Sequence, residues 1–179
     1  VKMRSYQPPH RGHSGQIRKA IDELIHAKRP VIYSGGGVVQ GNAAAQLTEL
    51  AHILGYPVTN TLMGLGAFPG DDPQFIGMLG MHGTYEANMA MHDCDVMINI
   101  GARFDDRITG RLDAFSPGSK KIHVDIDPSS INKNVKADIG IVGDCGHVLK
   151  SMLAEWKALE KAPDRKRLDP WWSEIKTWQ

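Results

Sequence analysis

Residues 97–111 read MINIGARFDDRITGR, and this segment changes character in its middle. It begins with an uncharged, largely apolar run, which is typical of a strand that is buried on both faces. A Gly-Ala pair ends the run, and three arginines and two aspartates follow within nine residues. Charges are costly to bury. The cluster is therefore expected at an edge of the core, where a buried strand opens toward solvent or toward a ligand.

The same layout recurs along the chain. Five short apolar or β-branched runs are predicted to be strands, and they begin at Val31, Pro57, Val96, Lys120 and Ile139. Apolar residues at helical spacing lie between or beside them. Strands that alternate with helices predict an α/β fold, with an open, mostly parallel sheet and helices on both faces, as in Rossmann-like domains.

Capping residues mark where the predicted helices begin. Ser14, Thr84 and Asp144 each precede a helical pattern and can accept a hydrogen bond from its first turn. A further apolar stripe over residues 44–54 is closed by Gly55, and the aromatic tail up to Gln179 is also expected to be helical.

Right-handed crossovers place the carboxyl ends of all parallel strands at one edge of the sheet, and ligands bind at that edge. Glycine, acidic or arginine residues follow each predicted strand, and a Gly-containing loop, LGMHGT, begins at Leu79. Glycines let a backbone approach a ligand closely, acidic side chains can accept hydrogen bonds from ribose hydroxyls, and arginines can bind a pyrophosphate. Together these residues predict a dinucleotide site.

An ordinary NAD-binding fingerprint is absent. Gly35 and Gly37 fit its first two glycines, but Gln40 stands at the third position and Gly41 comes one residue late. About twenty residues after Gly37, residues 57–62 contain no acid.

The charge cluster has a second interpretation. Arg103, Arg107 and Arg111 could form surface ion pairs with Asp105 and Asp106, and such pairs add little stability. Their position directly after a buried strand, in line with the other strand ends, favours the ligand-binding interpretation. His82 has no visible carboxylate partner, so it is expected to pack near the ligand and not to act as a base.

Composition excludes several classes of protein. A net charge of +1 over 179 residues, without a basic stripe, argues against binding to nucleic acid. No apolar run approaches the ~20 residues that span a bilayer, so no membrane contact is expected. Cys94 and Cys145 are far apart and are expected to be reduced thiols in a cytoplasmic protein.

The two ends differ from the middle. Residues 1–13 are polar and contain adjacent prolines, as linkers do, and residues 161–179 are charged and then rich in tryptophan. Residues 14–160 are therefore expected to form one nucleotide-binding domain, flanked by an interdomain linker and by a helix leading toward a further domain.

Five segments resemble the large catalytic subunit of acetolactate synthases, also called acetohydroxyacid synthases. They are RPVIYSGGGV, TNTLMGLGAFPG, LGMHGTYEAN, INIGARFDDRITG and VDIDPSSINKN. The resemblance covers most of the chain and is to the central domain of a three-domain thiamine-diphosphate enzyme. It implies a six-stranded parallel sheet that holds FAD. It also implies that thiamine diphosphate and Mg²⁺ are bound by other domains.

The resemblance assigns a set of FAD-binding residues. They are Gly35, Gly36 and Gly37 near the ADP half; Thr61, Leu62 and Met63 near the flavin; Leu79, Gly80, Met81 and His82 along the cofactor; Gly101, Ala102, Arg103, Asp105, Arg107 and Ile108 as the main clasp; and Asp125, Ile126, Gly143 and Asp144 around the adenosine. Asp106 and Arg107 also correspond to a channel in which herbicides lodge. Asn60 departs from the family pattern, in which a smaller or hydroxyl side chain is usual.

Catalytic parts of the family are missing from this chain. The glutamate that activates thiamine belongs to the N-terminal domain, and the Gly-Asp-Gly motif with its later Asn-Asn belongs to the C-terminal domain. The nearest match, Gly143-Asp144-Cys145, has cysteine in place of the motif's second glycine, and no Asn-Asn pair follows it. No catalytic residue or metal ligand is therefore expected here, and the isolated chain is predicted to be inactive.

The parent enzyme would decarboxylate pyruvate and join the two-carbon unit to a second 2-oxo acid, in the synthesis of branched-chain amino acids. Its expected partners are its own N- and C-terminal domains, further copies of itself and a small regulatory subunit. Two alternatives stay open from the sequence. One is a stand-alone nucleotide-binding or regulatory module, and the other is a sister thiamine enzyme such as glyoxylate carboligase.

Overall fold

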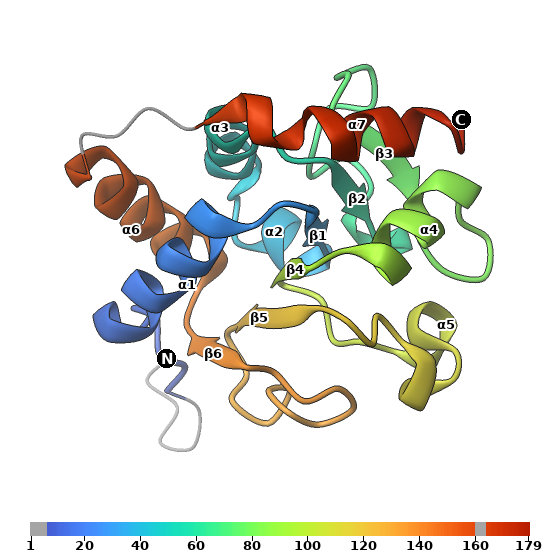
Figure 1. Cartoon of the computed structure of the whole chain (residues 1–179). Coiled ribbons are helices and arrows are strands. Elements are labelled where there is room, and N and C mark those ends of the chain that lie inside the picture. The colour runs from blue at the N-terminus through green and yellow to red at the C-terminus, as the bar shows by residue number, and fades with distance from the viewer. Residues whose placement is uncertain (1–6, 160–163) are drawn as a thin grey trace.

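A six-stranded, wholly parallel sheet forms the centre of the molecule (Figure 1). The computed structural model describes residues 7–159 and 164–179. The strands, in the order β3-β2-β1-β4-β5-β6, are β1 (Pro30–Ser34), β2 (Val58–Asn60), β3 (Phe75–Met78), β4 (Val96–Ile100), β5 (Lys120–Asp125) and β6 (Ile139–Val142). The predicted α/β class and parallel sheet are confirmed.

Helices cover both faces of this sheet. The α-helices are α1 (Ser14–His26), α2 (Gly36–Gln40), α3 (Ala44–Leu54), α4 (Tyr85–Asp93), α5 (Asp106–Thr109), α6 (Cys145–Ala158) and α7 (Asp169–Lys176). Short 3₁₀ turns occupy η1 (Leu62–Gly64), η2 (Leu112–Ala114) and η3 (Arg165–Leu168). One apolar cluster lies under α1, α3 and α6, and a second lies under α4 and α7.

The central strands are buried on both faces, which explains their uninterrupted apolar sequences. Every residue of β1 and of β4 is buried. Ile32 faces the first cluster, whereas its neighbours Val31 and Tyr33 face the second. This alternation is the two-residue period of a strand with a core on each side.

Two of the three predicted helix caps are confirmed. The Thr84 hydroxyl accepts the backbone N–H of Ala87 at 3.3 Å, and the Asp144 carboxylate accepts that of His147 at 3.1 Å. Ser14 is not a cap: it is the first residue of α1, and the side chain of His13 before it makes no capping bond. The N–H groups of Gln16 and Ile17 instead have the backbone carbonyl of His13 as their acceptor.

Strand β3 carries no clear strand signal of its own, although the family resemblance implies six strands. It lies at the edge of the sheet, and most of its residues are only half-buried. Gly77 has φ +90°, and the register with β2 shifts between Val58 and Asn60. An irregular, half-exposed edge strand has neither a strict alternation nor a continuous apolar run.

The two predicted flanking segments, 1–13 and 161–179, lie partly outside the described residues, because the structure does not describe residues 1–6 and 160–163. Within the described part, the carbonyl of His10 accepts the N–H of Asp144 at 3.1 Å. At the other end, α7 buries Trp171 and Ile175 in the second cluster.

Both cysteines are free, as their separation in the sequence predicts, and both are buried. Burial raises the pKa of Cys94 to about 11 and that of Cys145 to about 12. We therefore expect both thiols to react slowly with a thiol reagent at pH 8 in the folded protein, because the thiolate is the reactive form. After unfolding without a reductant, both should react quickly. A mass deficit of two hydrogens in the intact chain would contradict this expectation.

Candidate functional site

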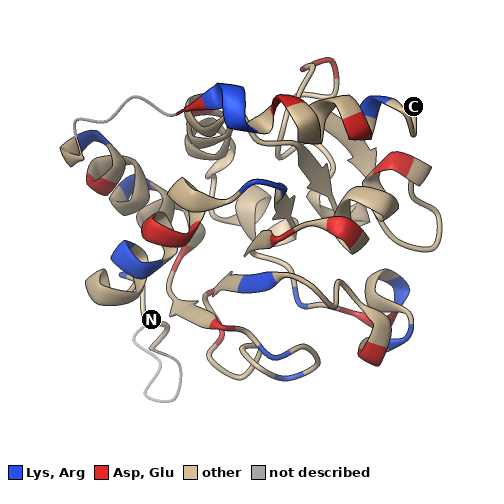
Figure 2. Ribbon diagram, viewed as in Figure 1, with Lys and Arg blue, Asp and Glu red and all other residues tan. Residues whose placement is uncertain are grey.

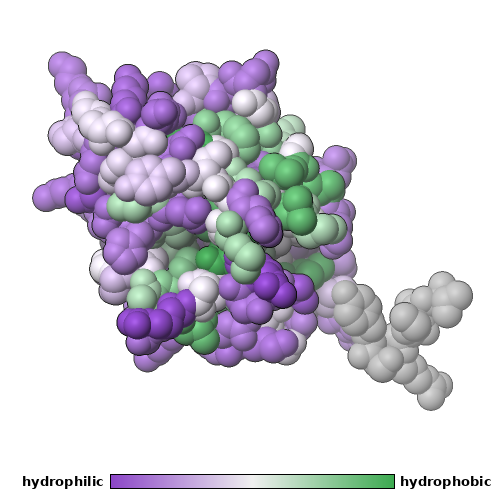
Figure 3. Space-filling model, turned by 90° about the vertical axis from the view of Figure 1, so that its right-hand side faces the viewer, coloured by the Kyte–Doolittle hydropathy of each residue, from purple (hydrophilic) through white to green (hydrophobic). Residues whose placement is uncertain are grey.

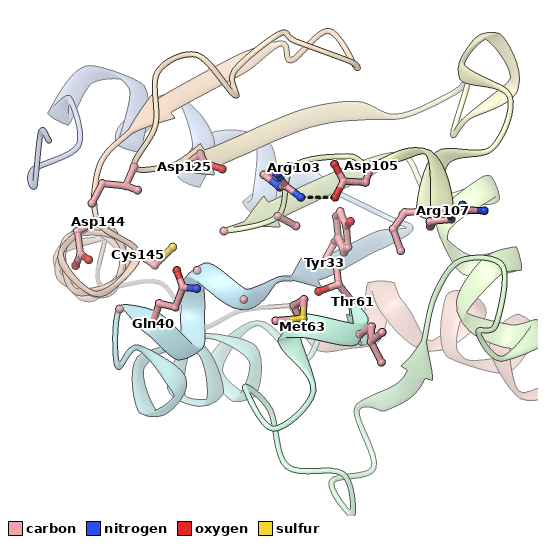
Figure 4. Close-up of a pocket in the computed structure, with 18 of the residues that line it drawn as sticks. Tyr33, Gln40, Thr61, Met63, Arg103, Asp105, Arg107, Asp125, Asp144 and Cys145 are labelled. Atoms are coloured by element: carbon pink, nitrogen blue, oxygen red, sulfur yellow. Dashed lines mark hydrogen bonds and ion pairs between the residues drawn. The ribbon is translucent and has the colours of Figure 1, made fainter. Parts of the chain in front are cut away.

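The order of the strands reverses at the centre of the sheet, between β1 and β4. The chain proceeds from β1 to β2 and β3 on one side, and from β4 to β5 and β6 on the other. In open α/β sheets, ligands bind beyond the carboxyl ends of the strands at such a switch point. A cleft of about 860 Å³ opens there, and it is lined from five strand ends (Figure 4). Its volume falls within the roughly 300–1,000 Å³ of small-molecule sites.

Close packing of glycine backbones shapes the floor of this cleft. The N–H of Gly35 donates to the carbonyl of Ile100 at 2.9 Å, and that of Gly37 donates to the carbonyl of Gly101 at 3.0 Å. A Cβ atom on Gly35 would lie 2.3 Å from the carbonyl oxygen of Gly101, and Gly101 itself has φ +68°. Side chains at these positions would force β1 and β4 apart, so the glycines are required for the close approach.

An ion pair stands at the rim of the cleft. Arg103 Nη2 lies 2.7 Å from Asp105 Oδ2, and the two side chains are 70% and 49% exposed. A pair this exposed adds little to stability. Phe104, between the two residues, has φ +54° and a buried ring, and the Asn134 amide donates to its carbonyl at 3.0 Å. Phe104 thus fixes the backbone between Arg103 and Asp105, whose weak ion pair lies at the opening of the cleft.

Buried polar groups fix the turn that carries Arg103. Asn99 donates to the carbonyl of Ala102 at 2.8 Å and accepts its N–H at 3.0 Å. His123 Nε2 also donates to that carbonyl at 2.8 Å, and its ring meets Phe104 edge-to-face, with 5.0 Å between the ring centroids. Burial lowers the pKa of His123 despite these contacts and the nearby Asp125. His123 is therefore neutral and stabilises the turn that carries Arg103 through its hydrogen bond to the carbonyl of Ala102.

The far end of the cleft is acidic. Asp125 is 7% exposed and accepts the N–H of Asp127 at 2.9 Å. Partial burial raises the pKa of Asp144, but hydrogen bonds from His147 outweigh this effect and hold that pKa below its usual value. In Figure 4, Asp144 and Cys145 lie at the end of the cleft opposite to Thr61 and Arg107.

Most of the residues assigned from the sequence meet in this cleft. Its lining includes Gly36, Gly37, Thr61, Leu62, Met63, Gly101, Ala102, Arg103, Asp105, Arg107, Ile108, Asp125, Ile126 and Asp144.

Gly35 and Gly143 do not line it, because they pack against backbone: Gly35 against Gly101 and Gly143 against Gly12.

The segment after β3 lies elsewhere. Leu79 is buried beside a separate cavity of about 170 Å³. A Cβ on Gly80 would lie 2.7 Å from the carbonyl oxygen of Arg107, and the N–H of Met81 donates to that oxygen at 3.0 Å. Met81 and His82 are exposed and do not line the cleft. In this structure, residues 79–81 support the Arg107 loop from outside.

Several lining residues were not assigned to the cofactor from the sequence. They are Tyr33, Gln40, Gly41, Asp106 and Cys145. Asp106 belonged to the charge cluster, and Gln40 and Gly41 belong to the failed fingerprint, so both patterns carried a signal. Tyr33 stands inside an apolar strand, where nothing in the local sequence marks a ligand site, and Cys145 directly follows the assigned Asp144 at the start of α6.

The charges outside the cleft are mixed. Acidic and basic residues alternate over the ribbon without forming a basic stripe in the described part of the chain (Figure 2). Among residues 7–159 and 164–179, no group of three His, Cys, Asp or Glu side chains could hold a metal ion. None of the helices described is long and apolar enough to cross a membrane.

Comparisons with known proteins agree with the sequence motifs. The chain is 51% identical over 179 residues to the acetolactate synthase large subunit of Buchnera aphidicola subsp. Acyrthosiphon pisum, and this covers 100% of the chain and 31% of that protein. It is 49% identical over 182 residues to the acetolactate synthase isozyme 3 large subunit of Escherichia coli, with the same coverage of both chains. A probable acetolactate synthase large subunit of Methanocaldococcus jannaschii is 51% identical over 160 residues, which are 89% of this chain and 27% of that protein.

The chain therefore spans about a third of the length of these relatives. The family described as thiamine pyrophosphate enzyme, central domain, matches residues 17–152, which include every strand and every residue of the cleft. With the switch-point cleft and the parallel sheet, this match shows that the chain belongs to the thiamine pyrophosphate enzymes and represents their central domain.

Proposed function

We propose that this chain is the FAD-holding central domain of an acetolactate synthase large subunit. The main support is the 51% identity that extends over the whole chain to a protein of that name. The parent enzyme would decarboxylate pyruvate and add the two-carbon unit to a second 2-oxo acid. Thiamine diphosphate and Mg²⁺ would act in its other domains, and this chain would contribute no catalytic residue.

The cleft offers suitable groups for FAD. An acidic residue, Asp125, lies toward one end of the cleft, Arg103 lies near its middle, and Arg107 lies toward the other end (Figure 4). Carboxylates bind ribose hydroxyls, and the guanidinium fork suits a pyrophosphate. The glycines on the floor leave backbone close to the ligand. Tyr33 adds a buried hydroxyl without a partner among the described residues.

FAD in this role would serve as a structural group, held between domains. The residues of this chain would bind and orient it: Arg103 and Arg107 at the phosphates, Asp125 at the adenosine ribose, and residues 61–63 beside the flavin. The loop of residues 79–82, which lies outside the cleft here, would reach the cofactor only if it moves. The proposal assigns no proton transfer to any of these side chains.

Neighbouring domains would cover the exposed apolar side chains. Leu62, Met63 and Met81 are 67%, 73% and 63% exposed, and Leu65 and Tyr85 are also exposed. Figure 3 shows apolar patches among the hydrophilic surface on one side of the molecule. Larger apolar patches mark interaction sites. Residues 1–13 and 161–179 are proposed as connections to those domains. A cytoplasmic location, a homo-oligomer and a small regulatory subunit stay predictions from the family resemblance.

The test is to purify the full-length protein and to measure its flavin content and its activity. We expect FAD to be released on denaturation, and acetolactate to form from pyruvate when Mg²⁺ and thiamine diphosphate are added. The 179-residue chain alone should bind FAD weakly and form no acetolactate. Tighter binding of NAD than of FAD or ADP would refute the cofactor assignment, and acetolactate formation by the short chain would refute its non-catalytic role.

A further inference from the structure

Tyr33 carries a polar atom that the folded chain leaves unused. Its side chain is fully buried, and its hydroxyl makes no hydrogen bond to any residue that the structure describes. Leaving a buried hydroxyl unpaired is unfavourable, and such groups in native proteins usually have a partner. Burial, together with the charge of Asp105, raises the pKa of Tyr33, so the hydroxyl stays protonated and able to donate.

The position of this hydroxyl connects it with the cleft. Tyr33 is one of the lining residues, and its ring packs against Phe104, with 5.7 Å between the ring centroids. Figure 4 shows the side chain pointing toward the Arg103–Asp105 pair at the rim. That pair is exposed and weak, so a ligand that binds Arg103 can open it at little cost.

We infer that Tyr33 is an additional ligand-binding residue of the cleft, whose hydroxyl gains its hydrogen-bond partner only when the ligand is bound. The inference rests on the proposed function in taking FAD as that ligand. A ligand whose phosphates bind Arg103 would separate Arg103 from Asp105 at the rim above Tyr33. Oxygen atoms of the ligand could then accept a hydrogen bond from the Tyr33 hydroxyl. The unpaired hydroxyl therefore destabilises the ligand-free protein, and ligand binding removes this destabilisation.

This inference predicts opposite effects of one substitution, Tyr33→Phe, which removes only the hydroxyl. FAD affinity of the full-length protein should fall by about 3- to 10-fold, the equivalent of one hydrogen bond between neutral groups. The unfolding transition of this domain in the flavin-free protein should shift upward, by about 2–4 °C for a domain of 150–250 residues, because a buried unpaired group is gone. Flavin fluorescence titration measures the first effect, and calorimetry measures the second.

Tyr56→Phe is the matched control. Tyr56 is also fully buried, but its hydroxyl donates to the carbonyl of Leu24 and accepts from Arg167 Nη2 at 3.1 Å, away from the cleft. Its removal should lower the thermal midpoint and leave FAD affinity unchanged. A purely structural role of Tyr33 would make the two variants behave alike.

The possible failures can be told apart. If the wild-type protein binds FAD and Tyr33→Phe binds it equally well, the inference about Tyr33 is wrong and the proposed function stands. If Tyr33→Phe lowers the midpoint as Tyr56→Phe does, the hydroxyl already has a partner in the empty protein, and the inference is also wrong. If the wild-type protein binds no FAD, both the inference and the cofactor assignment fail.

Discussion

Replacing Trp171 with alanine is expected to destabilise the folded chain by about 3–5 kcal/mol, the usual cost of deleting a buried tryptophan side chain. Trp171 is 1% exposed, and its Nε1 donates to the carbonyl of Pro30 at 3.0 Å. The Arg29 guanidinium carbon lies 4.7 Å from the centroid of its ring. The truncation removes apolar burial, a hydrogen bond and a cation–π contact together. Urea unfolding of the variant measures the loss.

The expected loss is a large fraction of total stability, which is only about 5–15 kcal/mol for a typical protein. The measured loss of stability has an upper limit, however, which is the free energy that holds α7 against the rest of the chain. Helix α7 lies at the end of the described chain, so it can detach before the sheet unfolds. Hydrogen exchange distinguishes these cases: detachment exposes the amides of α7, whereas global loss exposes β1 and β4 as well.

Glu174→Gln is the control for Trp171→Ala. Glu174 also joins α7 to the start of β1, through an ion pair of 2.7 Å with Arg29. Both partners of this pair are 39–40% exposed, and exposed pairs contribute about 0–1 kcal/mol. A control that loses as much stability as Trp171→Ala would show that charge, and not packing, holds α7 in place.

The sheet itself was largely predictable from local patterns. Residues 96–100 form β4 because an apolar run buried on both faces suits only a central parallel strand. Thr84 and Asp144 begin helices because their side chains can satisfy free N–H groups of the first turn. In these places, local chemistry and the global fold agree. β3 was harder to predict, because a half-exposed edge strand containing a glycine at positive φ matches no simple pattern.

The candidate site was predictable where residues follow strands, but not where tertiary packing decides. Topology alone brings residues after β1, β2, β4, β5 and β6 to one cleft. The segment that begins at Leu79 also follows a strand, yet β3 is the outermost one, and this loop packs behind Arg107. Tyr33 could not be recognised at all, since a tyrosine inside an apolar strand has the same sequence signal whether or not its hydroxyl has a partner.

Replacing Arg103 with alanine in the full-length protein is expected to weaken FAD binding by about 10- to 150-fold. The estimate corresponds to one charge-assisted hydrogen bond, worth roughly 1.5–3 kcal/mol. Arg103 lines the cleft, and its present partner, Asp105, would be left unpaired beside an anionic ligand. Folding stability should change by only a few tenths of a kcal/mol, because the Arg103–Asp105 pair is largely exposed.

Activity then depends on the concentration of cofactor. Added FAD should restore much of the acetolactate formation, because mass action offsets a binding defect. A residue that acts in the chemical step behaves differently, since its loss lowers turnover even at saturating FAD. Titration of FAD into the variant, with acetolactate formation as the readout, separates these two possibilities.

Arg111→Ala provides the comparison for Arg103→Ala. Arg111 belongs to the same charge cluster and pairs with Asp113 at 2.8 Å, but both side chains are exposed and neither lines the cleft. We expect its FAD affinity to equal that of the wild-type protein. The two arginines therefore test the two interpretations of the cluster within one segment: a surface ion-pair network predicts that neither substitution matters, and a ligand clasp predicts that only Arg103 does. Unchanged FAD affinity in Arg103→Ala would remove Arg103 from the site, whatever its turnover.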